Sequence, residues 1–195
     1  DLSVSASNTR SISSTAVDNL TLTYTNPTEL EGRWVTGCVA SGDYYLIKTI
    51  AVSGTNVTDK YEFHSDSSCA NDSYSEDSTY SSLSIGDAMT FDTYGSSGGS
   101  GHEITMTIDT NTYTSLSASD VTWNNNNSWC GETDWVLNTP QSIAGKTCGS
   151  TASWNTNTTI YGLYLLDGNK LFPSFSSSSY PSGVDAEDND TLTKQ

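Results

Sequence analysis

Alternation of apolar and polar side chains in two short segments constrains this chain more than any other feature of its sequence. Successive side chains of a β-strand point to opposite faces, so a period of two predicts a strand with one buried and one solvated face. The alternation occurs in the segments 56–64 and 102–108. The side chains that we expect on the buried faces are Val57, Tyr61, Phe63, Ile104, Met106 and Ile108. Both faces are therefore expected to point toward one common interior.

Two further regions favour strands, and no run of ten or more residues shows helical periodicity. The run 44–52 is rich in aromatic and β-branched residues, and a Ser-Gly-Thr turn separates it from 56–64, which predicts a hairpin. The run 159–166 leads into Asp167-Gly168, a dipeptide typical of type I′ hairpin turns. Shorter strand candidates are the segments 20–24 and 89–94.

These patterns predict an all-β protein of about eight to ten strands, folded as an antiparallel β-barrel, with a β-sandwich as the alternative. Residues 1–29 are expected to form a polar N-terminal arm that contains the strand candidate Leu20–Tyr24, and residues 30–195 a single barrel domain. The segment 121–149 has no clear period and is interpreted as a long excursion closed by a disulfide. The tail 174–195 is interpreted as loop and edge strand.

Four cysteines indicate disulfides rather than a metal site, because none forms the C-x2-C spacing of common zinc knuckles. We favour the sequential pairing Cys38–Cys69 and Cys130–Cys148, since each pair brackets a plausible hairpin. Disulfides form in oxidising compartments, so the chain is expected to be secreted, periplasmic or on the cell surface.

The formal net charge of −16 excludes nucleic acid as an expected partner and disfavours an anionic membrane surface. No run of 18 apolar residues occurs, so no transmembrane segment is expected. The start Asp1-Leu-Ser-Val-Ser lacks the features of a signal peptide, and we expect any export signal to have been removed.

No motif in the chain predicts catalysis. Gly95-Ser-Ser-Gly-Gly99 fits G-x-S-x-G, but more glycine and then a strand follow it, which indicates a linker rather than a nucleophile turn. His64 lies on the polar face of its strand and is expected to be exposed. The acidic segment 185–190 lacks the glycine and glutamate positions of an EF-hand loop and is expected to be solvated. We therefore expect no enzyme activity, no catalytic residue, no metal and no cofactor.

Four tryptophans lie close together in the sequence, interleaved with asparagine and glycine. They either stack on sugars or line the mouth of a pocket, or they cover the disulfide and the end of the barrel. They are Trp123, Trp129, Trp135 and Trp154.

The segment Leu30-Glu-Gly-Arg-Trp-Val-Thr-Gly-Cys38 contains the G-x-W pattern Gly32-Arg33-Trp34, which resembles the first strand of lipocalin-type barrels. With His64-Ser-Asp-Ser-Ser-Cys69, it is similar to the ectodomains of the adenomatosis-polyposis-coli down-regulated Wnt inhibitors. The stretch Tyr161 to Leu171 and the final Thr-Lys-Gln resemble uncharacterised bacterial secreted proteins or lipoproteins. The first two resemblances imply a lipocalin-like barrel, and the second implies binding of a lipid or acyl chain.

The leading hypothesis is a non-enzymatic extracellular barrel that binds an apolar or amphipathic small ligand such as a lipid. Its expected ligand-binding residues are Trp34, Val57, Tyr61, Phe63, Ile104, Met106 and Ile108. The sequence leaves open whether these side chains line an open pocket or fill the interior. The alternative is a structural or adhesive surface subunit that self-associates by adding its N-terminal arm to a neighbouring sheet.

Overall fold

The predicted hairpin around Gly54 is present in the computed structural model, which describes residues 28–91, 99–184 and 191–195. Strand β3 (Tyr44–Ser53) pairs with β4 (Asn56–His64) from Tyr45 to Ser53. Gly54 adopts the positive φ of 59° that the turn requires. Val52 lies opposite Val57 and Leu46 opposite Phe63, but between these apolar pairs the same face carries Lys48 and Asp59.

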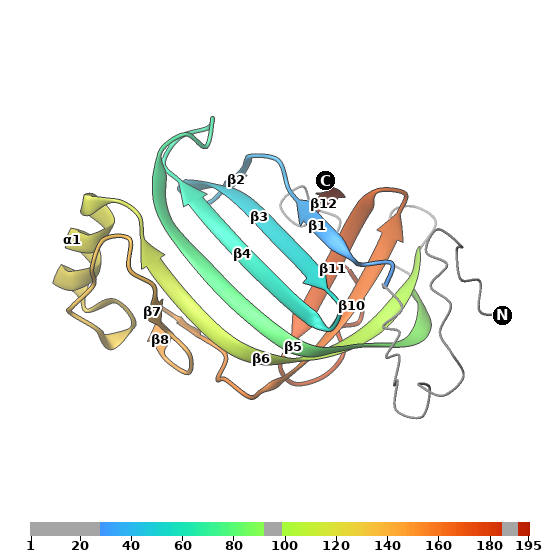
Figure 1. The fold of residues 1–195 in the computed structure, drawn as a ribbon. Helices are drawn as coiled ribbons and strands as arrows, with labels where there is room; N and C mark the ends of the chain where they lie inside the picture. Colours follow the sequence, from blue (N-terminus) through green and yellow to red (C-terminus); the bar gives the residue numbers. More distant parts are fainter. Residues whose placement is uncertain (1–27, 92–98, 185–190) are drawn as a thin grey trace, which may run out of the picture.

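The other elements follow in chain order (Figure 1). They are β1 (Gly32–Val35), β2 (Val39–Ser41), β5 (Asp72–Phe91), β6 (Gly99–Ser115), α1 (Ala118–Asn127), a 3-10 turn (Trp129–Gly131), β7 (Gln141–Ser142), β8 (Thr147–Cys148), β9 (Thr151–Ala152), β10 (Thr159–Asp167), β11 (Lys170–Ser176) and β12 (Leu192–Lys194).

Eight strands form a closed antiparallel barrel in which spatial neighbours are also successive barrel strands of the chain. The order around the barrel is β1, β3, β4, β5, β6, β10, β11 and β12, and β12 pairs with β1 to complete the ring. The short strand β2 extends the sheet beside β3, and β7 pairs with β6. The predicted antiparallel β-barrel is therefore confirmed, and the sandwich alternative is not adopted.

Trp34 of β1 helps to seal the barrel where its first and last strands meet. It pairs with Ile50 of β3 on one side and with Lys194 of β12 on the other. Its side chain is 1% exposed, its indole N–H donates to the Leu30 carbonyl oxygen at 2.7 Å, and the Lys194 ammonium lies 4.9 Å from the ring centroid. The tryptophan thus combines apolar burial, a satisfied N–H and a cation–π contact.

The largest departure from the prediction is β5. The strand predicted at 89–94 is only the end of a strand that runs from residue 72 to residue 91, and the Ser- and Asp-rich stretch before it, for which no strand was predicted, forms most of this strand. Several of its inward positions are polar, which hides the period of two in the sequence. Pairing with β4 on one side and β6 on the other holds the strand in place, and three register shifts against β6 give it the bulges that let a long strand curve.

The β10–β11 hairpin is present, but its turn differs from the prediction. Asp167 pairs with Lys170, so the two turn residues are Gly168 and Asn169 rather than Asp167 and Gly168. Only Gly168 has a positive φ, whereas a type I′ turn requires a positive φ at both central residues.

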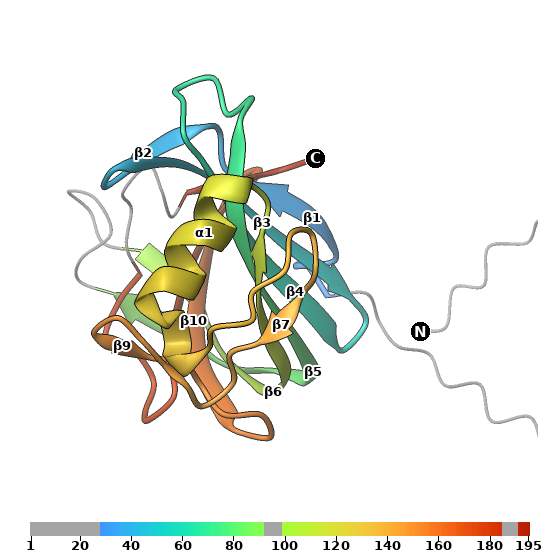
Figure 2. The ribbon, with the colours of Figure 1, turned by 90° about the vertical axis from the view of Figure 1, so that its left-hand side faces the viewer.

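Helix α1 was not predicted. It lies in the region of the excursion assigned to 121–149, where the run Trp-Asn-Asn-Asn-Asn supplies no apolar face with a helical period. In the described parts of the chain, no helix is long and apolar enough to span a bilayer. Figure 2 shows α1 lying across the near end of the barrel.

Both predicted disulfides, Cys38–Cys69 and Cys130–Cys148, are present, as expected for an oxidising compartment. The expectation that His64 is exposed is wrong: its relative exposure is 5%, and its Nδ1 lies 3.1 Å from Oδ1 of Asp72. The predicted tail strand exists as β12, but it pairs with β11 and β1 and is not an edge.

Some predictions fall outside the described residues. These are the strand at Leu20–Tyr24 with nearly all of the arm 1–29, most of the motif Gly95–Gly99, and the acidic segment 185–190.

Candidate functional site

The barrel interior changes character in three levels between the β3–β4 turn and α1. Along β4 the inward side chains from the turn onward are Val57, Asp59, Tyr61 and Phe63. The residues opposite them on β5 are, in the same order, Tyr80, Ser78, Glu76 and Tyr74. The level near the turn is therefore apolar, the middle level is polar, and the level beneath α1 is aromatic.

The apolar level is packed. It contains five of the seven residues predicted to bind a ligand, namely Trp34, Val57, Ile104, Met106 and Ile108, each at most 5% exposed. The cavity lined by three of them, Val57, Ile104 and Met106, measures about 20 Å³, which is room for about one water molecule. Tyr61 and Phe63 belong to the middle and aromatic levels, so the structure does not bring the seven residues together around one pocket.

The middle level is a polar chamber of about 550 Å³. Lys48, Asp59 and Glu76 bring one basic and two acidic side chains to its wall. The Lys48 ammonium lies 4.8 Å from the centroid of the Tyr61 ring, and burial raises the pKa of Glu76 above its ordinary value.

Phe175 separates the polar chamber from the apolar level, because its side chain lines the cavities of both. The ring lies over Gly162 of the neighbouring strand β10. A Cβ atom at position 162 would lie 2.7 Å from Cδ1 of Phe175, so the missing side chain makes room for this partition.

The aromatic level is built on a row of stacked rings across β4, β5 and β6. The Phe63 and Tyr74 centroids are 4.4 Å apart and the Tyr74 and Tyr113 centroids 5.0 Å apart, with interplanar angles of 16° and 15°. Tyr44 meets Tyr74 edge-on at 5.4 Å, and Trp135 meets Tyr113 edge-on at 5.0 Å. Both faces of Tyr74 are thus covered, which leaves only its rim for any further contact.

Helix α1 places polar side chains above this aromatic row. The helix begins after Ser117, whose hydroxyl oxygen accepts a hydrogen bond from the Asp120 backbone N–H at 3.1 Å, a typical N-cap. It ends at Ser128, which adopts a left-handed conformation with φ of 50°. Asp120 lies in the first turn and Asn124 one turn later, so both point to the same side of the helix.

Asp120 and Asn124 connect the helix to β6 through a buried hydrogen-bond network. The Tyr113 hydroxyl donates to the two carboxylate oxygens of Asp120 at 2.9 and 3.0 Å. The amide nitrogen of Asn124 donates to Asp120 Oδ2 at 3.0 Å and to Ser115 Oγ at 3.1 Å. Burial raises the pKa of Asp120, although these donors oppose the shift.

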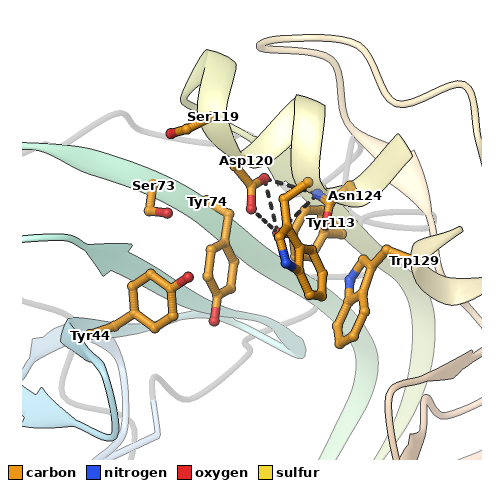
Figure 3. A pocket seen from close by; sticks show the side chains of 9 residues that line it. Tyr44, Ser73, Tyr74, Tyr113, Ser119, Asp120, Asn124 and Trp129 are labelled. Carbon is orange, nitrogen blue, oxygen red and sulfur yellow. Dashed lines mark hydrogen bonds between the residues drawn. The ribbon is translucent and has the colours of Figure 1, made fainter. Parts of the chain in front are cut away.

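A pocket of about 430 Å³ lies between α1, the aromatic row and the loop after the helix (Figure 3). Its lining residues are Tyr44, Ser73, Tyr74, Tyr113, Ser119, Asp120, Trp123, Asn124 and Trp129. Trp123 is 52% exposed, and its ring meets Trp129 edge-on at 5.5 Å.

Two buried atoms of pocket-lining residues have no hydrogen-bond partner within the described parts of the chain. They are the amide oxygen of Asn124, an acceptor, and the indole N–H of Trp129, a donor. Unpaired buried polar atoms are rare in proteins, and each one calls for an explanation. Here both occur around one pocket.

The disulfide-closed loop fixes the Trp129 side of the pocket. Cys130 follows Trp129 directly and is bonded to Cys148. The side chain of Asn125 accepts from the Trp135 backbone N–H at 2.7 Å and donates to its carbonyl oxygen at 3.1 Å, which ties the loop back to α1. Trp135 then packs with Cys130 and Tyr113 in a small core.

The sequence predicted only part of this site. Of the four clustered tryptophans, Trp123 and Trp129 line the pocket, Trp135 packs beside the disulfide, and Trp154 packs against the barrel core. The pocket alternative thus fits Trp123 and Trp129, and the disulfide alternative fits Trp135. Asp120 and Asn124 were missed, although the spacing Ser117-x-x-Asp120 is a helix-start signal that points to them.

The chain matches no model of a known protein family and no curated protein sequence.

Proposed function

We propose that this protein is a non-enzymatic, extracellular binding protein that holds a small amphipathic ligand in the pocket beneath α1. The observation that carries the proposal is a buried carboxylate, Asp120, in an aromatic pocket of about 430 Å³. Small-ligand sites typically measure about 300–1,000 Å³ and combine mostly apolar walls with a few fixed polar groups.

The location of the pocket modifies the lipid-carrier hypothesis. A lipid tail in the apolar level would require a cavity much larger than the 20 Å³ among Val57, Ile104 and Met106. The pocket beneath α1 offers space, aromatic surface and hydrogen-bonding groups at once. The implied ligand therefore has an apolar part and a polar part, rather than a long hydrocarbon chain.

The surroundings of the pocket support a rigid binding site. A disulfide closes the loop beside Trp129, and the network through Tyr113, Asp120 and Asn124 holds α1 against β6. A preorganised site loses less conformational entropy on binding.

The proposal is tested by titrating the full chain with a panel of small aromatic and alkyl amines, alcohols, carboxylic acids and glycosides, observed by amide chemical shifts. We expect at least one class to bind and the largest shifts to fall on α1, Tyr44 and Tyr113. Trp123→Ala should weaken this binding, whereas Tyr180→Ala, which removes an exposed ring elsewhere, should not. Absence of binding across the panel, or shifts centred on Met106 and Ile108, would overturn the proposal.

A further inference from the structure

Resting on the proposed ligand site, we propose that the ligand is a small organic ammonium ion. Its charge meets the Asp120 carboxylate, and its apolar part lies against the rings of Tyr44, Trp123 and Trp129. The inference combines the charge balance of the pocket, its unpaired acceptor and the geometry of its rings.

The first argument is the charge of Asp120. The side chain is 9% exposed, and no lysine, arginine or histidine of the described residues forms an ion pair with it. Its side-chain hydrogen-bond partners, Ser115, Tyr113 and Asn124, are all neutral and cannot balance a full negative charge. Buried charges in proteins are usually paired. Because no described residue supplies a cation to Asp120, we infer that a ligand cation pairs with the carboxylate from the pocket.

The second argument is the hydrogen-bond inventory of the polar wall. The amide nitrogen of Asn124 is fully used, but its Oδ1 accepts from no described residue. Asp120 and Asn124 therefore both carry acceptor oxygens on one side of α1, and that of Asn124 is unused. An ammonium N–H is the matching donor. The unpaired indole N–H of Trp129 suits an oxygen atom elsewhere on the same ligand.

The third argument is which rings remain available. Phe63 and Tyr113 cover the two faces of the Tyr74 ring, and Tyr74 and Trp135 pack against the Tyr113 ring. The rings of Tyr74 and Tyr113 therefore pack within the pocket wall and are not available for stacking with a ligand. Tyr44, Trp123 and Trp129 have no stacked partner in the described chain and line the pocket. The face of an aromatic ring carries partial negative charge and attracts cations, most strongly for tryptophan.

The net negative charge of the whole molecule also favours a cationic ligand. A chain with 23 acidic and 7 basic side chains carries a negative potential that concentrates cations and repels anions. A neutral sugar would use the same rings and acceptors but would gain nothing from this field or from the charge of Asp120.

The test compares near-isosteric probes by calorimetry at neutral pH with the full chain: phenethylamine as cation, 2-phenylethanol as neutral analogue, 3-phenylpropanoate as anion and methyl β-glucoside as sugar. We expect phenethylamine to bind about tenfold or more tightly than 2-phenylethanol, since a hydrogen bond to a charged partner is the stronger interaction. The anion should bind most weakly.

Two variants assign the preference to its residues. Asp120→Asn should lower phenethylamine affinity about tenfold or more and 2-phenylethanol affinity much less, because only the amine carries a charge that meets the carboxylate. The matched control Asp109→Asn removes an exposed carboxylate outside the pocket and should change neither affinity. Because Asp120 also supports the fold, Trp123→Leu provides a second test at an exposed position, where loss of the ring should weaken amine binding about two- to fivefold.

The outcomes separate the two proposals. Equal binding of phenethylamine and 2-phenylethanol, or tighter binding of the glucoside, would overturn the ammonium inference and leave the pocket as a binding site. An amine preference that survives both Asp120→Asn and Trp123→Leu would also overturn it. Failure of every probe class in the wider panel would remove the proposed function itself.

Discussion

The apolar and aromatic levels of the barrel interior are built from the same strands, yet they differ in what their side chains do. Near the β3–β4 turn, Ile108 and Met106 are essentially inaccessible and leave about 20 Å³ of empty space. Beneath α1, Tyr74 and Asn124 border about 430 Å³, and the pocket contains unpaired polar atoms. The comparison teaches that one level stabilises the fold by close packing, which allows the other to keep open space and unpaired polar atoms.

The largest change in the free energy of unfolding should come from a substitution in the apolar level. Trp34→Ala removes a ring that is 1% exposed and should lower the free energy of unfolding by about 3–5 kcal/mol. Trp123→Ala removes a ring that is 52% exposed and should cost well under 1 kcal/mol while weakening ligand binding. Urea unfolding of both variants measures the contrast, and equal losses would contradict the division between the two levels.

Removing each of the two disulfides should cause a loss of stability of intermediate size, and the two variants form a matched pair. Removing Cys130–Cys148 or Cys38–Cys69 by double alanine substitution should each cost about 2–4 kcal/mol, because each closes a chain loop. Only the first borders the pocket, so only its loss should weaken binding of the best probe. If both variants lose affinity equally, the loop beside Trp129 does not define the site.

Met106→Trp tests directly whether the apolar level is filled. Adding a large ring to this site should overpack it and lower stability by about 1–3 kcal/mol, without changing binding beneath α1. A variant as stable as the natural protein, accompanied by loss of binding of a fatty acid, would indicate an open lumen at Met106 and restore the lipid-carrier hypothesis.

The smallest expected change in stability comes from substituting Glu76 in the polar chamber. Burial raises its folded-state pKa, so its contribution to stability is complete below its ordinary pKa of about 4.3 and is lost as the pH rises through the folded-state pKa. Glu76→Gln should therefore stabilise the protein slightly at neutral pH and have no effect near pH 3.5.

The control for Glu76 is Glu62→Gln on the same sheet. Glu62 pairs with Lys60 at 2.8 Å on a partly exposed face, so its loss should be neutral or slightly destabilising at neutral pH. Urea midpoints across the pH range measure both variants. A destabilising Glu76→Gln at pH 7 would show that basic groups such as Lys48 already compensate the carboxylate.

Strands that local sequence signals specify were predicted correctly, whereas strands that depend on pairing with distant neighbours were not. The β3–β4 hairpin was predicted within a residue because its apolar face and its glycine turn are both local signals. Most of strand β5, residues 72–88, was missed because Ser78 and Glu76 occupy inward positions where the pattern expects apolar residues, and only pairing with two neighbours makes it a strand.

The candidate site was harder to predict because its members are distant in sequence. Tyr44, Tyr74 and Tyr113 come from three strands, and barrel closure brings them to the same end. The cysteine pairing was predictable from spacing, but the position of Trp129 against α1 was not, since it depends on hydrogen bonds such as that from Trp135 to Asn125. Asp120 carried a helix-start signal but no indication of its burial.

The pairing of β1 with β12 has a consequence for how the chain assembles. Trp34 and Lys194 are partners at opposite ends of the described sequence, so the ring closes only after the intervening strands have aligned. Such a distant contact incurs a large loop-closure entropy, and we expect it to form late and folding to be slow. Until β12 docks, β1 and β11 each present an open strand edge to other molecules. By covering both edges once they dock, the three residues of β12 therefore protect the folded protein against edge-to-edge aggregation, a role out of proportion to their number.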